Sequence, residues 1–348
     1  MQLNTLKKDY ESGSVMASFH IALFYLRTNQ KLFNLWIDKA IDHELKIAWD
    51  FMMSYEGQKL VTPKFIQSRF NTSGFAEYYL ATISFKPTKE GFETFASLID
   101  KAIHMKCQKA KQLKAIILEN FSIDITDKDE LLKLFDSVKL SAKNVSSNRE
   151  VSLYTQTFNS DFSMLIIDEL SIYLQPSLIL DPVNNQPRLS PHRTAFSAQW
   201  LPSTLGFLGL LFEKLITELI DTQAQYGEPM TLLQYLPGQE YKPHFDFINN
   251  HEHGYSDGQQ RVKTILIGLN SEEYQGGDTL FPNIKAKFHL MCGDILVFNN
   301  TSTDGKLLQD SLHQSTPIIS GKKTIISKWI RQSKTTYDSE KLNFLKIN

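Results

Sequence analysis

The stretch YLPGQEYKPHFD, from Tyr235 to Asp246, decides how the rest of the sequence is interpreted. Within it, His244 and Asp246 are two residues apart, so on a β-strand their side chains project from the same face. One imidazole nitrogen and one carboxylate oxygen could then bind the same metal ion. A His-x-Asp pair arises easily by chance and often marks only a polar surface strand, so a third ligand is needed.

His313, in the stretch DSLHQSTP, is the candidate for that third ligand. Two histidines and one carboxylate on one face of a metal ion leave three positions open, and non-haem Fe(II) oxygenases use this arrangement. The open positions admit a bidentate 2-oxo acid and then dioxygen. Zinc is more often held in a closed shell, or by three ligands and one water, and would recruit cysteine or a third histidine. We therefore predict an Fe(II) site made of His244, Asp246 and His313.

Lys323 is predicted to hold the far end of a cosubstrate with two carboxylates, such as 2-oxoglutarate. It lies ten residues after His313, and a turn at Ser320-Gly321 would let the chain return as the next antiparallel strand. A lysine at this place acts as a point charge for one carboxylate. Lys322 is the neighbouring alternative, but it would point to the opposite face of the strand.

The bulk properties exclude several classes of protein. The 348 residues suffice for two domains with separate cores. The net charge of −1 gives no global attraction to nucleic acid or to an acidic membrane. Two cysteines, Cys107 and Cys292, give no disulfide framework and fit a reducing compartment. The first apolar run lacks the length and purity of a signal peptide or membrane helix. We expect a soluble, cytoplasmic protein that binds neither nucleic acid nor membrane.

The first 140 residues are predicted to form a helical domain, because apolar residues recur there at intervals of three and four. The sequence IDKAI occurs twice, at residues 37–41 and 99–103. Such an echo could mark a helical repeat of the tetratricopeptide or Sel1 type, or two unrelated amphipathic helices that share five residues by chance. The lone histidines of this half suggest no chemistry.

The chain after residue 140 has a different pattern. The polar stretch 141–152 is predicted to be a linker, and residues 150–335 a second domain. Short β-like runs follow at Met230–Tyr235, Thr264–Leu269, Asp294–Phe298 and Lys323–Trp329, with helices near 167–174 and 205–220. Many short strands with tight turns predict a β-sandwich or jelly roll with flanking helices. The expected fold class is α+β.

Residues 155–332 resemble the catalytic domain of the prolyl 4-hydroxylases, within the 2-oxoglutarate- and Fe(II)-dependent dioxygenases. The resemblance covers about half of the chain and says nothing about residues 1–140. The matching motifs keep the order and spacing of the family. Besides the stretch quoted first, they are RVKT (Arg261–Thr264), GGDTLFP (Gly276–Pro282), GDILVF (Gly293–Phe298), SLH (Ser311–His313), Pro317, GKK (Gly321–Lys323) and KWIR (Lys328–Arg331), with Arg193-Thr194 upstream.

The resemblance implies a double-stranded β-helix with iron at the three ligands already named. It implies that Lys323 pairs with the distal carboxylate of 2-oxoglutarate, that Tyr235 donates a hydrogen bond to it and that Thr264 assists there. Tyr241 and Trp329 match aromatic residues that line the peptide side of the pocket. The implied reaction converts 2-oxoglutarate and O2 to succinate and CO2 while a C–H bond is hydroxylated, and family members often need L-ascorbate.

Two residues depart from the family's pattern and put the shape of the pocket in doubt. Thr324 replaces the aromatic residue that commonly follows the cosubstrate lysine, and Ser315 stands where a small residue is often found, two positions after the distal histidine. His251 and His253 lie in a polar stretch where the family carries a substrate-covering loop, so we interpret them as part of a lid and not as a second metal site. His289 is interpreted as structural.

Three hypotheses follow. The first is a hydroxylase acting on a prolyl residue of a peptide or protein, which the helical half could help to recruit. The second keeps the oxygenase chemistry and changes the target to another side chain or a small molecule. The third is an inert scaffold of the same fold, whose helical half binds a partner.

Overall fold

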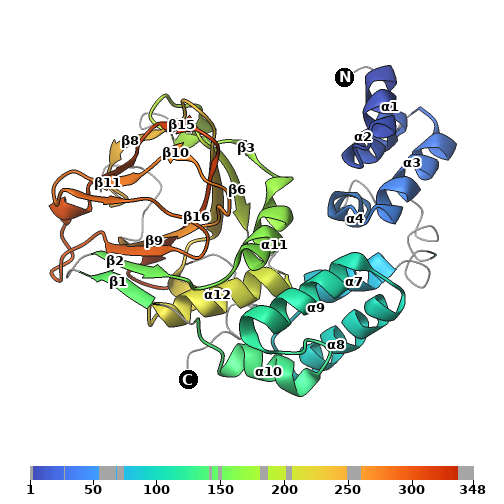
Figure 1. Ribbon diagram of the computed structural model, residues 1–348, viewed down its shortest axis with the longest axis horizontal. Helices are drawn as coiled ribbons and strands as arrows, with labels where there is room; N and C mark the ends of the chain where they lie inside the picture. Colours follow the sequence, from blue (N-terminus) through green and yellow to red (C-terminus); the bar gives the residue numbers. More distant parts are fainter. Residues whose placement is uncertain are drawn as a thin grey trace. The chain divides into compact units, whose positions relative to one another are not determined.

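The computed structural model describes residues 3–26, 28–54, 68, 74–140, 143–147, 151–180, 187–200, 206–248 and 260–335. The chain divides into two compact units, Met1–Leu132 and Lys133–Asn348. The first unit is helical and the second is built on antiparallel sheets, so the fold class is α+β as predicted (Figure 1). None of the helices in these ranges is both long and apolar enough to cross a membrane.

The described part of the first unit consists of short helices joined by tight turns. Apolar residues at helical spacing are buried between them, for example Phe33, Ile37 and Ala40 on one helix. The helices are α1 (Leu3–Glu11), α2 (Met16–Tyr25), α3 (Gln30–Asp42), α4 (Lys46–Met53), α7 (Gly74–Ser84), α8 (Lys89–His104) and α9 (Gln108–Phe121), and α10 (Lys128–Asp136) continues into the second unit.

The sequence echo has a structural counterpart. Its two copies form the ends of α3 and α8, and each helix is followed by one residue in the left-handed conformation, Glu44 (φ 55°) and Lys106 (φ 65°). In both cases the next N–H donates to the alanine carbonyl of the echo, at 3.1 Å and 3.0 Å. This is the usual hydrogen-bonded end of an α-helix. The copies therefore share a helix end and the start of a following helix, α4 or α9.

Two facing sheets form the second unit, and together they make the expected jelly roll. The eight strands described in the larger sheet are ordered β1-β2-β13-β9-β16-β7-β6-β3, and the smaller sheet is ordered β12-β11-β14-β8. The larger sheet contains β1 (Lys143–Ser147), β2 (Val151–Thr155), β13 (Ile295–Asn299), β9 (Arg261–Gly268), β16 (Lys323–Arg331), β7 (Met230–Tyr235), β6 (Phe196–Trp200) and β3 (Gln175–Pro176).

The smaller elements complete the jelly roll. The smaller sheet contains β12 (Ala286–Phe288), β11 (Thr279–Phe281), β14 (His313–Ser315) and β8 (Tyr241–His244). The remaining strands pair as β10 (Gln275–Gly276) with β15 (Ile318–Ser320) and as β4 (Ile179–Leu180) with β5 (Pro187–Arg188), and two 3₁₀ turns are η2 (Ala224–Tyr226) and η3 (Gln309–Ser311).

The predicted linker at residues 141–152 is wrong for its described part. Residues 143–147 form β1, which pairs antiparallel with β2 at the edge of the larger sheet. The sequence of β1, KNVSS, has a single apolar residue. An edge strand is held by backbone hydrogen bonds along one side, so it can form without the alternation of apolar residues that sequence analysis detects.

The strand β16 separates the interior of the jelly roll from its helical cover. Its residues Lys323, Ile325, Ser327 and Trp329 all line one cavity, as the two-residue period of a strand requires. The helices α11 (Ser160–Ser171) and α12 (Phe207–Leu219) lie against the larger sheet, on the side away from β8 and β11 (Figure 1). The prediction for α12 was close, whereas α11 begins earlier than expected because Asn159 caps it by accepting from Phe162 N–H.

A buried ion pair joins β16 to α12. Lys328, which is 0% exposed, donates to Glu213 Oε1 at 2.8 Å and to the Glu228 carbonyl at 3.1 Å. We expect Lys328→Met to lower the free energy of unfolding by about 3–5 kcal/mol, because it leaves the Glu213 carboxylate buried without its cation. Urea unfolding measures the change. The double variant Glu213→Leu/Lys328→Met should recover most of the loss, and an additive double variant would contradict this account.

Candidate active site

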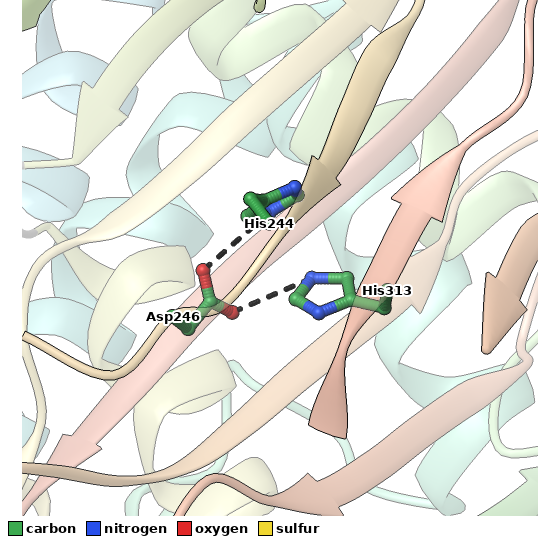
Figure 2. Close-up of side chains that lie close together, drawn as sticks. All are labelled: His244, Asp246 and His313. Atoms are coloured by element: carbon green, nitrogen blue, oxygen red, sulfur yellow. Dashed lines mark ion pairs between the residues drawn. The ribbon is translucent and has the colours of Figure 1, made fainter. Parts of the chain in front are cut away.

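The smaller sheet brings the two predicted histidine ligands together. His244 ends β8 and His313 begins β14, and the two residues are direct partners in the antiparallel register. Their ring centroids are 4.2 Å apart. Asp246 follows β8 by two residues, and its carboxylate points toward both rings (Figure 2). The structure therefore brings together the three residues that the sequence predicted as a metal site.

Both imidazoles present Nε2 to Asp246. His244 Nδ1 lies 2.7 Å from the Lys242 carbonyl oxygen, and His313 Nδ1 lies 2.9 Å from the Ser311 carbonyl oxygen. A carbonyl oxygen can only accept, so each Nδ1 carries a proton and each Nε2 faces Asp246. Backbone carbonyls orient metal-binding histidines in this way. Burial and the neighbouring His313 lower the pKa of His244, so its imidazole is neutral and can serve as a ligand.

The spacing of these atoms fits a metal ion better than a hydrogen-bonded cluster. The Nε2 atoms of His244 and His313 lie 3.7 Å and 3.6 Å from the nearest oxygens of Asp246. These distances are too long for hydrogen bonds. One ligand atom from each of the three residues lies within 4.8 Å of the other two, so the three side chains are grouped closely enough to hold one metal ion. Within the described ranges no second group of His, Cys, Asp and Glu has such geometry.

Asp246 is held by a chain of two hydrogen bonds. Thr264 Oγ1 donates to Asp246 Oδ2 at 2.7 Å, and Asn300 Nδ2 donates to Thr264 Oγ1 at 2.8 Å. Burial alone would raise the pKa of the Asp246 carboxyl, but His313, His244 and Arg261 hold that pKa below its ordinary value. The carboxylate is therefore ionised and fixed in orientation, as a metal ligand requires.

Lys323 lies in the same cavity as the three ligands. It is 1% exposed, and its Nζ donates to the Gly277 carbonyl at 2.6 Å and to Ser315 Oγ at 3.0 Å. Burial lowers the pKa of Lys323 to about 7, although Asp278 opposes the shift. Lys322, the alternative considered from the sequence, is exposed. Ser315, a departure from the family's pattern, thus supplies a hydroxyl partner for the lysine.

Tyr235 lies beside Lys323 and keeps its proton. The two residues are partners in the β7–β16 register, and Lys323 Nζ is 5.5 Å from the centroid of the Tyr235 ring. Burial raises the pKa of Tyr235 to about 12, so its hydroxyl is available as a hydrogen-bond donor. Both residues line the cavity.

Thr264 is placed differently from the sequence prediction. It was expected beside Lys323, but it is the register partner of Trp329, six residues further along β16. At about 3.3 Å per residue, Lys323 and Trp329 lie about 20 Å apart along β16, so the backbone of Thr264 is far from that of Lys323. Its hydroxyl is engaged with Asp246 instead. The better-placed hydroxyl is that of Thr279, which lines the cavity and has a buried Oγ1 without a hydrogen-bond partner among the described residues.

The remaining lining residues form the wall around the metal ligands. The Tyr241 ring stacks on His244 with centroids 3.5 Å apart, and Trp329 lies under Arg261, whose guanidinium carbon is 3.8 Å from the indole centroid. Both aromatic residues line the cavity, as does Arg193, which lies 5.3 Å from the Tyr241 ring centroid. Arg193 and Thr279 occur in motifs noted in the sequence, but no role was predicted for either.

Two other histidine predictions have different outcomes. His251 and His253 lie outside the described residues. His289 Nδ1 is 2.8 Å from Asp278 Oδ1, and its ring stacks on Tyr274. His289 does not line the cavity of the metal ligands.

The two threonines provide a matched pair of variants. We expect Thr264→Val to weaken Fe(II) binding about 10-fold, because loss of a partner that orients a metal ligand typically has this effect. Thr279→Val should leave Fe(II) affinity unchanged and weaken binding of 2-oxoglutarate. Anaerobic titrations with Fe(II), and then with 2-oxoglutarate, measure both constants. Unchanged Fe(II) affinity in Thr264→Val would show that the hydrogen bond to Asp246 does not support the site.

Comparisons with known proteins point to one family. The sequence model described as the 2OG-Fe(II) oxygenase superfamily matches residues 230–331. The protein named "Probable prolyl 4-hydroxylase 10" of Arabidopsis thaliana is 26% identical over 54% of this chain and 70% of its own length. "Prolyl 4-hydroxylase 13" of the same plant is 37% identical over 32% of this chain and 45% of its own length.

A solved structure is similar to part of the chain. It is that of the viral collagen prolyl hydroxylase from Paramecium Bursaria Chlorella virus-1 in complex with 2OG. Its sequence identity is 21%, the match covers 54% of this chain and 99% of that protein, and the TM-score is 0.43.

Proposed function

We propose that this chain, whose residues 230–331 match the model of the 2OG-Fe(II) oxygenase superfamily and which is similar to prolyl 4-hydroxylases, hydroxylates a prolyl residue of a peptide or protein. The reaction consumes 2-oxoglutarate and O2 and releases succinate and CO2. The observation that carries the proposal is the shared cavity: two imidazoles and one ionised carboxylate converge at one side of it, and the buried amine of Lys323 lies within it.

Each residue of the cavity has a defined task in this proposal. His244, Asp246 and His313 would hold Fe(II), which when bound supplies the activation of dioxygen and the oxidative decarboxylation of 2-oxoglutarate. Lys323 holds the distal carboxylate of 2-oxoglutarate by charge, and the Tyr235 hydroxyl donates to the same group. Both are buried, so water does not compete for the carboxylate.

The hydroxyl of Thr279 provides a further donor for that carboxylate, because it lines the cavity and is otherwise without a partner among the described residues. Tyr241 and Trp329 form the wall against which the substrate would lie, next to the metal ligands. Aromatic walls of this kind give a large contact area for a prolyl ring.

Two measurements test the function. Succinate released in a single turnover with Fe(II) and 2-oxoglutarate separates an active oxygenase from an inert scaffold of this fold. Mass spectrometry of proline-containing peptides, with matched peptides in which alanine replaces proline, then separates a prolyl substrate from any other. Succinate release without the gain of one oxygen on any prolyl peptide would move the substrate to another side chain or a small molecule.

Three finer points belong to the same proposal. The helical first unit would recruit the protein substrate on the outer faces of its helices. Two of its helix pairs, α3 with α4 and α8 with α9, are joined in the same way. L-ascorbate would restore iron oxidised without product, as the family resemblance implies. The protein would work in the cytoplasm, where both of its cysteines, which are free, would stay reduced.

A further inference from the structure

Asn270 bonds to the backbone on both sides of Lys323. Its Nδ2 donates to the Lys322 carbonyl at 2.5 Å, and its Oδ1 accepts from the Thr324 N–H at 2.5 Å. Asn270 lies two residues after the end of β9 and is buried. Its own carbonyl accepts from the Cys292 N–H at 2.7 Å, which ties the loop to the segment before β13. One primary amide thus links the backbone around Lys323 to the loop after β9.

These bonds occur where the ladder between β9 and β16 ends. The register between the two strands begins at Ile325, which pairs with Gly268, whereas the register with β7 already includes Lys323. Without the loop after β9, the first two residues of β16 would be held from one side only. The Leu269 N–H, which donates to the Thr324 carbonyl at 3.0 Å, and the Asn270 side chain continue the missing side.

We propose that Asn270 is a positioning residue that fixes the backbone at Lys323, so that the ammonium group meets the distal carboxylate of 2-oxoglutarate. This inference rests on the proposed function, in which Lys323 binds that carboxylate. Position matters because a misplacement of about 1 Å in a positioning element can lower a reaction rate by up to about 100-fold. A primary amide suits the task, because it carries both the donor that Lys322 requires and the acceptor that Thr324 requires.

The test compares two cosubstrates on the anaerobic Fe(II)-loaded protein. 2-Oxoglutarate carries the distal carboxylate and pyruvate does not, while both present the same 2-oxo acid group to iron. We expect Asn270→Ala to raise the Kd for 2-oxoglutarate about 10-fold, with less than about a twofold change in the Kd for pyruvate and unchanged Fe(II) affinity. The readout is the charge-transfer absorbance of the complex, so no turnover is required.

Control variants separate positioning from a general loss of structure. Tyr274→Phe removes a buried hydrogen bond to the Leu290 carbonyl from the same loop without touching Lys322 or Thr324, and it should leave both Kd values unchanged. Asn270→Asp keeps the acceptor for Thr324 but sets a carboxylate oxygen against the Lys322 carbonyl, so it should weaken 2-oxoglutarate binding at least as much as Asn270→Ala.

The outcomes distinguish this inference from the proposed function. If Asn270→Ala and Asn270→Asp bind 2-oxoglutarate as the wild type does, or weaken both cosubstrates equally, the positioning role is overturned and the proposed function stands. If the wild-type protein binds Fe(II) but shows no affinity for 2-oxoglutarate, the proposed function fails, and the role of Asn270 fails with it.

Discussion

The His313→Ala protein is expected to bind Fe(II) more than about 100-fold more weakly than the wild type and to release no succinate. The loss of a partner that merely orients a ligand weakens metal binding about 10- to 100-fold, and His313 is one of the three side chains that converge on the site among the residues that the structure describes. No other described histidine, cysteine or carboxylate is placed to replace it. Anaerobic Fe(II) titration measures the affinity directly.

Two further variants test whether the loss of Fe(II) binding is specific to His313. Lys323→Ala should retain Fe(II) and bind 2-oxoglutarate weakly, because Lys323 shares the cavity but is not a metal ligand. His104→Ala removes an exposed histidine of the first unit and should change neither the affinity for Fe(II) nor the affinity for 2-oxoglutarate. If His313→Ala kept the charge-transfer absorbance of the Fe(II)–2-oxoglutarate complex, the choice of ligands would be wrong.

His244, Asp246 and Lys323 could be predicted from the sequence because simple periodicity places them, whereas His313 was chosen because the pair needs a third ligand. His244 and Asp246 are two residues apart, and the two-residue period of a strand orients them together. The turn before Lys323 returns the chain antiparallel, and the same period distinguishes Lys323 from Lys322. These inferences require only local geometry and one pairing of strands, and the structure places each of these residues in the cavity or, for Lys322, outside it.

The residues that support the site could not be predicted in the same way. Thr264 and Thr279 are both inward-facing strand threonines, and only the register between β9 and β16 shows that Thr264 lies beside Trp329. The role of Asn270 depends on where the β9–β16 ladder ends, which no local pattern reveals. The strand β1 was missed because backbone pairing at a sheet edge leaves little trace in a polar sequence.

The affinity for 2-oxoglutarate is expected to fall as the pH rises above neutrality, because Lys323 must be charged to bind the distal carboxylate. Burial lowers the pKa of Lys323 to about 7 in the protein without ligand, and a bound carboxylate would raise it again. Below that pKa the ammonium is already protonated and the Kd is constant. Above it, binding must take up a proton, and the Kd rises about tenfold per pH unit. From about pH 6.5 to about pH 8.5 the expected increase is about 25-fold.

Pyruvate separates this effect from any pH dependence of the iron site. It lacks the distal carboxylate, so the ratio of the Kd for 2-oxoglutarate to the Kd for pyruvate isolates the contribution of Lys323. In Lys323→Arg the cation stays charged over the whole range, so that variant should bind 2-oxoglutarate with an altered affinity but a ratio that does not change with pH. A constant ratio in the wild type would mean that the buried ammonium keeps its proton in the empty cavity. In that case the carbonyl of Gly277, the hydroxyl of Ser315 and the charge of Asp278 would together offset the cost of burying it.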